Sequence, residues 1–291
     1  MFAFCLLHFA LRAYDPPVAS DVRMPSVAGS WYPSAPDHLA REVDRYVAEA
    51  EVAPAPPPRA IVVPHAGLVY SGAVAAHGFR AAATGHYAAI VLVGPSHFVP
   101  FRGVSIWARG AWQMPFGAVP IAETLAAAIA HASPEVCEHP AAHRREHSLE
   151  LQLPFLARLL AGTPIVPLVM GHQARGTAFA LGDAIADVIA GGADNILLVA
   201  SSDLSHYHDA VAAREMDEVV ASHVERLDAD GLMHDLEREP GHACGGGPMV
   251  SVMHAARRLG ATGARVLKYA DSGDVTGDKS SVVGYMAAAL Y

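Results

Sequence analysis

The chain has 291 residues, of which 52% are hydrophobic, so it is long and apolar enough to form one domain with a sizeable core. Its formal net charge is -9 and its 20 basic residues are scattered, which argues against a nucleic-acid-binding surface. The cysteines Cys5, Cys137 and Cys244 form no C-x-x-C pair, so we expect a reducing, cytoplasmic environment without a disulfide framework.

Residues 1–23 show no periodicity that predicts a folded element. Residues 1–13 are apolar but too short to span a bilayer, and they lack the basic start and cleavage site of a secretory signal. Met24 stands directly before the first segment with the character of a folded domain. We therefore predict a leader over residues 1–23, disordered or arising from a mis-assigned start, and a single domain over residues 24–291 that does not associate with membranes.

The first predicted elements are a loop over residues 27–33, VAGSWYP, and a helix over residues 37–51. Within the loop, Trp31 is either hydrophobic cover or one wall of a pocket. Residues 60–63 are four consecutive apolar residues, which is typical of a strand buried on both faces of a parallel sheet. Because Pro64 ends this strand, His65 follows at its carboxyl end, where α/β proteins bind their ligands.

The same pattern of a buried strand followed by a histidine recurs later in the chain. The apolar run in AIVLVGPSHF, residues 89–98, leads to His97, and the run over residues 195–200 leads to Asp203 and His206. A single histidine of this kind more often caps a loop, but polar residues at three strand ends are the usual composition of an α/β site. We expect the first two strands to be neighbours in the sheet.

The remaining pattern alternates between strands and helices. It predicts helices over residues 71–83, 121–131, 177–190, 210–226, 229–237 and 248–259, strands over residues 103–108, 164–170, 264–270 and 281–290, and an irregular or edge segment over residues 112–119. Alternation through residues 59–201 favours right-handed crossovers. The predicted fold is therefore a single α/β domain whose mostly parallel or mixed central sheet is flanked by helices on both faces.

Residues 148–160 predict an amphipathic helix, because leucines recur along one face. Pro154 falls inside this helix and should kink it or move its start. Glu146 and His147 lie just before it. Either the Glu146 carboxylate stabilises the helix dipole, or the two residues belong to the pocket of the site.

Cys244 lies in a glycine-rich turn, HACGGGP at residues 242–248, that opens a late helix. A free cysteine is commonly a small buried hydrophobic residue. Here, however, the helix N-terminus should lower the pKa of the Cys244 thiol, and the glycines let the backbone approach a ligand closely. Both features favour a thiolate that binds a metal or reacts.

Seven motifs occur in a fixed order over residues 27–291: VAGSWYP, PHAGLVYSG, VLVGPSH, EHSLELQLPFL, VPLVMG, SSDLSHY and CGGGP. Together they resemble the Memo family, also called protein B of the AmmeMemoRadiSam system, which is similar in fold to the class III extradiol ring-cleavage dioxygenases that use non-haem iron. The resemblance implies these site residues: metal ligands His65, His97 and Cys244, facing residues Asp203 and His206, and a pocket wall at Trp31. Family members often carry a larger residue where this chain has Gly246, which implies a wider or differently polar pocket floor.

Two imidazoles and one thiolate leave coordination positions open and suit one divalent metal, but the ligand set alone does not select among Fe(II), Zn(II) and copper. The resemblance to iron enzymes implies Fe(II) first, with Zn(II) or copper as alternatives. Extradiol enzymes use two histidines and a carboxylate instead, so the thiolate argues against plain ring cleavage. One function that fits is a metal-dependent, dioxygenase-like oxidoreductase in which His206 is the acid or base and Asp203 orients it. For that role, Asp203 and His206 should share one face of a helical turn.

The other function that fits is a non-catalytic protein that uses the same cleft to bind a small molecule, a peptide or a metal ion. Partner proteins of an AmmeMemoRadiSam-type system belong to this second hypothesis. Oxygen consumption with a panel of catechols separates the two functions.

Overall fold

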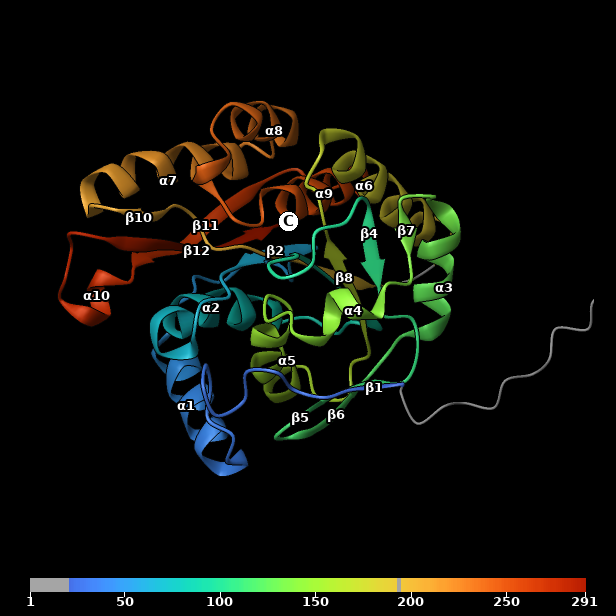
Figure 1. Ribbon diagram of the computed structural model, residues 1–291, viewed down its shortest axis with the longest axis horizontal. Coiled ribbons are helices and arrows are strands. Elements are labelled where there is room, and N and C mark those ends of the chain that lie inside the picture. The colour runs from blue at the N-terminus through green and yellow to red at the C-terminus, as the bar shows by residue number, and fades with distance from the viewer. Residues whose placement is uncertain (1–20, 193–194) are drawn as a thin grey trace, which may run out of the picture.

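A nine-stranded mixed sheet runs through the computed structural model, which describes residues 21–192 and 195–291 (Figure 1). Its four central strands are parallel and lie in the order β2 (Ala60–Val63), β9 (Ile196–Ser201), β3 (Ala89–Pro95) and β8 (Ile165–Met170). Every residue of β2, β3 and β8 is buried. Continuous apolar runs of this kind form the central strands of a parallel sheet because helices cover both of its faces.

The strands at both edges complete the mixed sheet. Beyond β2 lie β12 (Val282–Leu290), β11 (Ala264–Asp271) and β10 (His206–His208), and beyond β8 lie β4 (Val104–Ile106) and β7 (Val136–Cys137). β12 is antiparallel to β2, and β4 is antiparallel to β8. The expectation of a parallel sheet therefore holds for its centre, and the edges give it the mixed character.

Helices cover both faces of the sheet, as predicted. In the view of Figure 1, one group lies below the sheet: α1 (Pro36–Glu49), α2 (Leu68–Ala82) and α5 (Leu153–Leu159). A second group lies above it: α6 (Arg175–Ala190), α7 (Ala210–Glu225), α8 (Ala229–Arg238) and α9 (Gly246–Arg258). The remaining helices are α3 (Glu123–Ala132) and the short α4 (Pro140–Arg144), α10 (Gly273–Thr276), η1 (Glu150–Gln152) and η2 (Pro240–His242). Within the described ranges, no helix is long and apolar enough to cross a membrane.

Residues 111–120 form a β-hairpin that ends in an edge strand, so the predicted edge segment is correct and the irregular alternative is not. Strands β5 (Ala111–Met114) and β6 (Gly117–Pro120) pair antiparallel, and Gly117 adopts a φ of 121° at the turn. The short strand β1 (Val22–Arg23) joins β5 in parallel and completes a separate three-stranded sheet.

The predicted boundary at Met24 is wrong, because residues 22 and 23 belong to the fold. Arg23 is only 2% exposed, and its guanidinium forms an ion pair with the buried Glu150 carboxylate. The same carboxylate accepts hydrogen bonds from the backbone N–H of Ser26 and the hydroxyl of Tyr32. Residues 1–20 of the predicted leader, with Cys5, lie outside the described residues.

Pro154 moves the start of its helix instead of kinking it. The segment predicted as one helix over residues 148–160 contains η1 followed by α5, and Pro154 lies in the first turn of α5. A proline is tolerated there because the N–H of a first-turn residue has no partner within the helix.

Candidate metal centre

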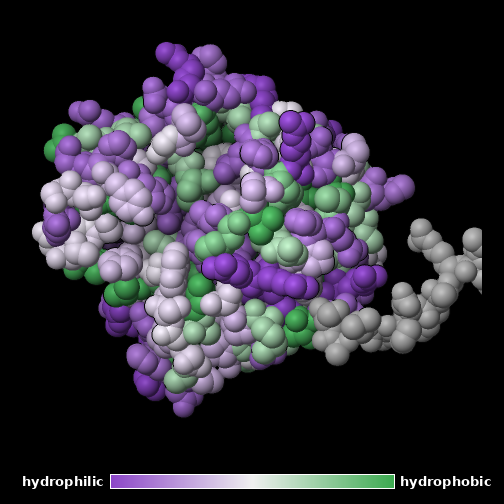
Figure 2. Space-filling model, viewed as in Figure 1, coloured by the Kyte–Doolittle hydropathy of each residue, from purple (hydrophilic) through white to green (hydrophobic). Residues whose placement is uncertain are grey.

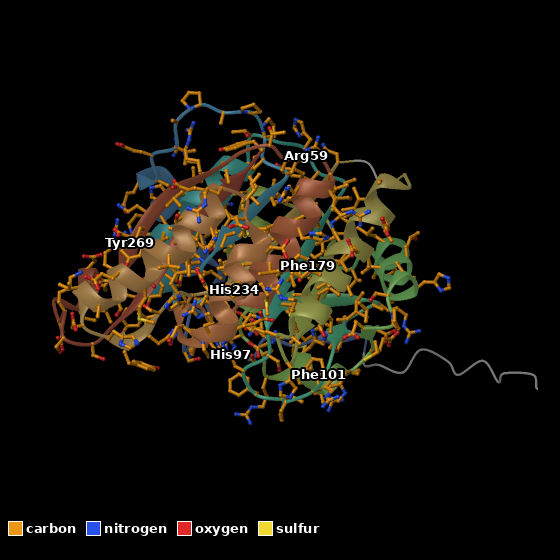
Figure 3. All side chains as sticks on the ribbon, turned by 90° about the horizontal axis from the view of Figure 1, so that it is seen from above. Arg59, His97, Phe101, Phe179, His234 and Tyr269 are labelled. Carbon is orange, nitrogen blue, oxygen red and sulfur yellow. The ribbon has the colours of Figure 1, made fainter. Side chains whose placement is uncertain are left out.

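The carboxyl ends of three parallel strands meet at one edge of the sheet. β9 lies between β2 and β3, so the predicted neighbours are not adjacent, but all three strands end at the same edge. Val63 pairs with Ser201, which places His65 and Asp203 each two residues beyond a paired position. The backbone N–H of His65 donates to Asp203 Oδ1 at 2.6 Å. In Figure 3, His97 lies in the lower part of the molecule and Arg59, which precedes β2, lies in the upper part.

The structure brings together the three residues that were predicted as metal ligands. One ligand atom from each of His65, His97 and Cys244 lies within 4.8 Å of the others. The rings of His65 and His97 are 5.2 Å apart, and Cys244 Sγ lies 3.2 Å from His65 Nε2. The ligands come from the loop after β2, the loop after β3 and the turn before α9.

Hydrogen bonds determine which nitrogen of His65 carries the proton. The Ser201 hydroxyl donates to the carbonyl of Ser148 at 2.6 Å, so its oxygen accepts from His65 Nδ1, 2.8 Å away. His65 therefore keeps a lone pair on Nε2, the atom that faces Cys244. Burial lowers the pKa of His65 to about 3, and the nearby His97 adds to the effect, so the ring is neutral.

Glu146 holds His97 in the same tautomer. The Glu146 side chain is fully buried and accepts from His97 Nδ1 at 2.9 Å and from the backbone N–H groups of His97, His147 and Ser148. Burial opposes ionisation, but the hydrogen bonds from the side chain and backbone of His97 and from the backbone of Ser148 lower the pKa of Glu146 to about 2. Glu146 is thus an ionised carboxylate behind the His97 ring, not a residue on the wall of the pocket, and it does not cap a helix.

His147 and Trp31 form one wall of the site. The His147 ring stacks on the His97 ring, with 4.5 Å between the ring centroids. The Trp31 ring is tilted relative to the His147 ring, with its centroid 4.3 Å from that of His147. His147 Nδ1 is buried without a hydrogen-bond partner, and burial lowers the pKa of the ring to about 4. His147 therefore presents a neutral imidazole to the cleft. Trp31 is 37% exposed and lines the cleft, which supports the second of its two sequence-based interpretations.

The prediction of a low pKa for the Cys244 thiol is wrong. Burial raises the pKa of Cys244, and the nearby Asp203 charge raises it further. The N–H groups at the start of α9 are directed elsewhere, because Gly245 donates to Ser202 Oγ and Gly247 donates to Gln173 Oε1. A bound cation would supply the positive charge that a Cys244 thiolate needs here.

Gln173 was missed by sequence reasoning, although it holds the cysteine turn in place. Its Nε2 donates to the carbonyl of Cys244 at 2.7 Å, and its Oε1 accepts from the N–H of Gly247, also at 2.7 Å. Gln173 follows β8 in a stretch without any motif that indicates a site. Only the proximity of β8 to the start of α9 reveals its function.

The expectation of a wider pocket floor at Gly246 is also wrong. Gly246 is buried, and a Cβ atom added to it would overlap the Leu236 side chain of α8. Leu236 therefore fills the space that a larger residue at position 246 would occupy.

Asp203 and His206 do not share a helical turn. His206 begins β10, while Asp203 Oδ1 accepts from the N–H groups of His65 and Ala66. His206 Nδ1 lies 2.7 Å from the carbonyl of Leu204 and must donate to it, which leaves Nε2 with the lone pair. Burial raises the pKa of Asp203, while the hydrogen bonds from residues 65 and 66 oppose that shift. Asp203 therefore orients the His65 loop instead of the His206 ring.

A cleft of about 950 Å³ contains these groups. It is lined by Trp31, His65, His97, His147, Asp203, His206 and Cys244, together with aromatic and small polar residues from α2, β10, β12 and α10. The predicted residues thus share one cleft, except Glu146, which lies behind its surface.

The fold and the site define an α/β protein in which two histidines and one cysteine converge in a cleft at the carboxyl edge of a mixed sheet. A family model described as Memo-like protein matches residues 23–289. The chain belongs to the Memo family.

Related proteins agree with this assignment. A MEMO1 family protein of Methanosarcina acetivorans is 37% identical over 273 residues, covering 92% of this chain and 98% of that protein. A MEMO1 family protein of Caldivirga maquilingensis is 34% identical over 281 residues, covering 92% of this chain and 99% of that protein. The crystal structure of the uncharacterized protein JW3007 from Escherichia coli K12 superposes with a TM-score of 0.54 at 16% identity. The superposition covers 78% of this chain and 98% of that chain. That structure supports the fold alone.

Proposed function

We propose that the chain is a metal-dependent oxidoreductase related to the extradiol dioxygenases, and that it holds one divalent metal, Fe(II), on His65, His97 and Cys244. The observation that carries this proposal is the pair of tautomers at the centre. The Nδ1–H groups of His65 and His97 donate to Ser201 and Glu146, so the Nε2 atoms of these neutral rings keep their lone pairs. A histidine whose second nitrogen is bonded to a carboxylate or hydroxyl is typical of a metal ligand.

The donor set fits a divalent transition metal. Two nitrogens and one sulfur suit Fe(II), Zn(II) or copper, and three protein ligands leave positions open for a substrate. When bound, an iron would supply Lewis-acid and redox chemistry at this point. The free cysteines Cys137 and Cys244 agree with the reducing environment of the cytoplasm.

The chain's own residues would supply proton transfer and orientation. His206 keeps a lone pair on Nε2 and lines the cleft, so it can take a proton from a bound hydroxyl group. Asp203 fixes the loop that carries His65, and the stacked His147 and Trp31 limit the space beside His97. These contacts orient the ligands before a substrate binds.

A second function is supported by the size of the cleft and by the thiolate. About 950 Å³ exceeds what one aromatic ring needs, and Cys244 stands where the extradiol enzymes have a carboxylate. Both features agree with a binding protein that holds a peptide, or a partner protein of an AmmeMemoRadiSam-type system, without turnover.

Oxygen consumption by the Fe(II)-loaded protein tests the choice between the two functions. Protein reconstituted without oxygen should retain close to one equivalent of iron, and it should then consume oxygen with at least one member of a catechol panel. Stoichiometric iron without oxygen consumption would favour the binding protein. Failure to retain any divalent metal would exclude the metal centre itself.

A further inference from the structure

The direction of the His206 ring depends on the peptide group that joins Leu204 to Ser205. His206 Nδ1 donates to the carbonyl of Leu204 at 2.7 Å. The N–H of Ser205 belongs to the same planar group, and it donates to Asp217 Oδ1 at 2.9 Å. The peptide is trans, so its C=O and N–H point in opposite directions. The His206 ring and the Asp217 carboxylate therefore hold the two ends of one rigid unit.

The rest of this loop is attached to β12. The Leu204 N–H donates to the carbonyl of Gly284 at 2.9 Å, and the Gly284 N–H donates to the carbonyl of Ser205 at the same distance. Ser205 is completely buried, so water does not reach its N–H. Within the described ranges, Asp217 is the acceptor that satisfies this buried donor.

Asp217 is itself fixed in position on the inner face of α7. Figure 2 shows mainly hydrophilic residues along the upper part of the view, where α7 and α8 lie in Figure 1, yet Asp217 is completely buried. Its Oδ2 accepts from the Tyr269 hydroxyl of β11 at 2.8 Å. A Cβ atom at Gly284 would overlap Oδ2, so only glycine at position 284 lets the carboxylate reach the loop.

The backbone that follows His206 is strained. Tyr207 has a φ of 64°, and the pairing of β10 with β12 shifts register between His206 and His208. A residue with a side chain rarely adopts such a φ unless the surrounding structure enforces it. Local backbone preferences would therefore not hold His206 in place, and the fixed peptide before it does so instead.

We propose that Asp217 is the positioning residue of His206: by fixing the Leu204–Ser205 peptide, it keeps the ring proton on Nδ1 and the lone pair on Nε2. Asp203 does not do this, because its carboxylate binds the His65 loop. The tautomer of His206 is a property of the folded chain and does not depend on turnover. Its consequence for proton transfer rests on the proposed function.

Nitrogen-15 NMR of the purified protein with labelled histidines tests the proposal and needs no bound metal. Two-bond correlations identify which nitrogen of a neutral imidazole carries the proton, and His206→Ala assigns the signals by their loss. Spectra are recorded at about pH 8.5, where an ordinary histidine is neutral. We expect the proton on Nδ1 in the parent and its transfer towards Nε2 in Asp217→Leu, which cannot accept the Ser205 hydrogen bond.

Asp217→Asn is the conservative variant. Its amide oxygen can accept from the Ser205 N–H and its amide nitrogen can donate to the Tyr269 hydroxyl, so it should retain the parental tautomer. Loss of the Nδ1 proton in Asp217→Asn to the same extent as in Asp217→Leu would overturn the proposal.

Asp228→Ala is the control for a general loss of stability. Asp228 accepts from the Gly231 N–H at the start of α8, so this variant also removes a bond from a carboxylate to the backbone. It should leave the His206 signals unchanged. An unchanged tautomer in folded Asp217→Leu, or an equal change in Asp228→Ala, would overturn the proposal.

Folding of the variants is checked by urea denaturation. If Asp217→Leu does not fold, Asp217→Ala replaces it, because the smaller side chain cannot overpack the site. Failure of both variants to fold would assign Asp217 to the stability of the domain and would also overturn the proposal.

Oxygen consumption by the Fe(II)-loaded variants separates failure of this inference from failure of the proposed function. Asp217→Leu should lower kcat at least about tenfold at unchanged iron content, and Asp217→Asn should restore it. An altered tautomer in Asp217→Leu, with no turnover in the parent, would retain the positioning residue and reject the oxidoreductase. Full turnover in Asp217→Leu would retain the oxidoreductase and reject the positioning residue.

Discussion

Glu146 Oε1 lies 2.9 Å from Nδ1 of His97, and the carboxylate that makes this contact is completely buried. The pair sets the tautomer of His97 and raises the basicity of its free nitrogen. It also explains why an ionised carboxylate is kept beneath the cleft without reaching its surface.

Glu146→Gln should weaken binding of Zn(II) by about 10- to 100-fold, because the amide lacks the charge that supports His97 as a ligand. Competition with a chromogenic chelator measures this affinity. Glu49→Gln, on the exposed end of α1, is the control and should bind as the parent does. Unchanged affinity in Glu146→Gln would show that the contact does not serve the metal.

Cys244→Ala should abolish the near-ultraviolet thiolate charge-transfer band of the Co(II)-loaded protein, since the sulfur is one of the three candidate ligands. Cys137→Ala removes an exposed cysteine of β7 and should leave the band intact. A band that persists in Cys244→Ala would assign the metal to other residues.

Gln173→Glu should loosen the cysteine turn, because a carboxylate oxygen would face the Cys244 carbonyl in place of the amide N–H. The expected result is weaker Co(II) binding with a shifted charge-transfer band. The matched change Gln113→Glu, in the separate three-stranded sheet, should alter neither property. An identical spectrum and affinity in Gln173→Glu would contradict this role.

Arg23→Met should lower the free energy of unfolding by about 3–5 kcal/mol, because it leaves the buried Glu150 carboxylate without its charge partner. Urea denaturation measures the change. Arg45→Met breaks an exposed pair with Glu49 and should cost less than about 1 kcal/mol. Similar losses in both variants would show that residue 23 is not part of the folded core.

The same pair predicts a pH dependence. Burial opposes the shift, but the Arg23 charge and the hydrogen bonds from residues 26 and 27 hold the pKa of Glu150 below its usual value. A group whose pKa is depressed in the folded state stabilises the protein above its unfolded pKa, and that stabilisation is lost as the pH falls through the folded value. The stability gap between the parent and Glu150→Gln should therefore be largest near pH 7 and shrink below about pH 4. A gap that grows on acidification would refute the assignment.

His206→Ala should leave the metal content unchanged and abolish turnover with any catechol that the parent oxidises, because His206 lines the cleft without belonging to the ligand set. Metal analysis and oxygen consumption are measured on the same preparation. Joint loss of metal and activity would instead assign His206 to the metal.

Much of the fold, and the strand ends and turn that carry the three candidate ligands, could be predicted from sequence, because they depend on local patterns. β2 occupies residues 60–63 as predicted, since four buried apolar residues followed by Pro64 define both ends of that strand. His65 and His97 each follow such a strand, and Cys244 is followed by three glycines at the start of a helix. Each of these signals lies within about ten residues of the chain, so no knowledge of packing was needed to find them.

Contacts between distant segments were decided by the tertiary structure alone. The insertion of β9 between β2 and β3 brings Asp203 to the His65 backbone across 138 residues, which the short spacing to His206 did not predict. Arg23 and Glu150 form their pair across 127 residues. Gln173 likewise meets the cysteine turn only because β8 ends beside α9. Such contacts depend on strand order, register and side-chain packing, and because these follow from the fold as a whole, no local pattern of residues encodes them.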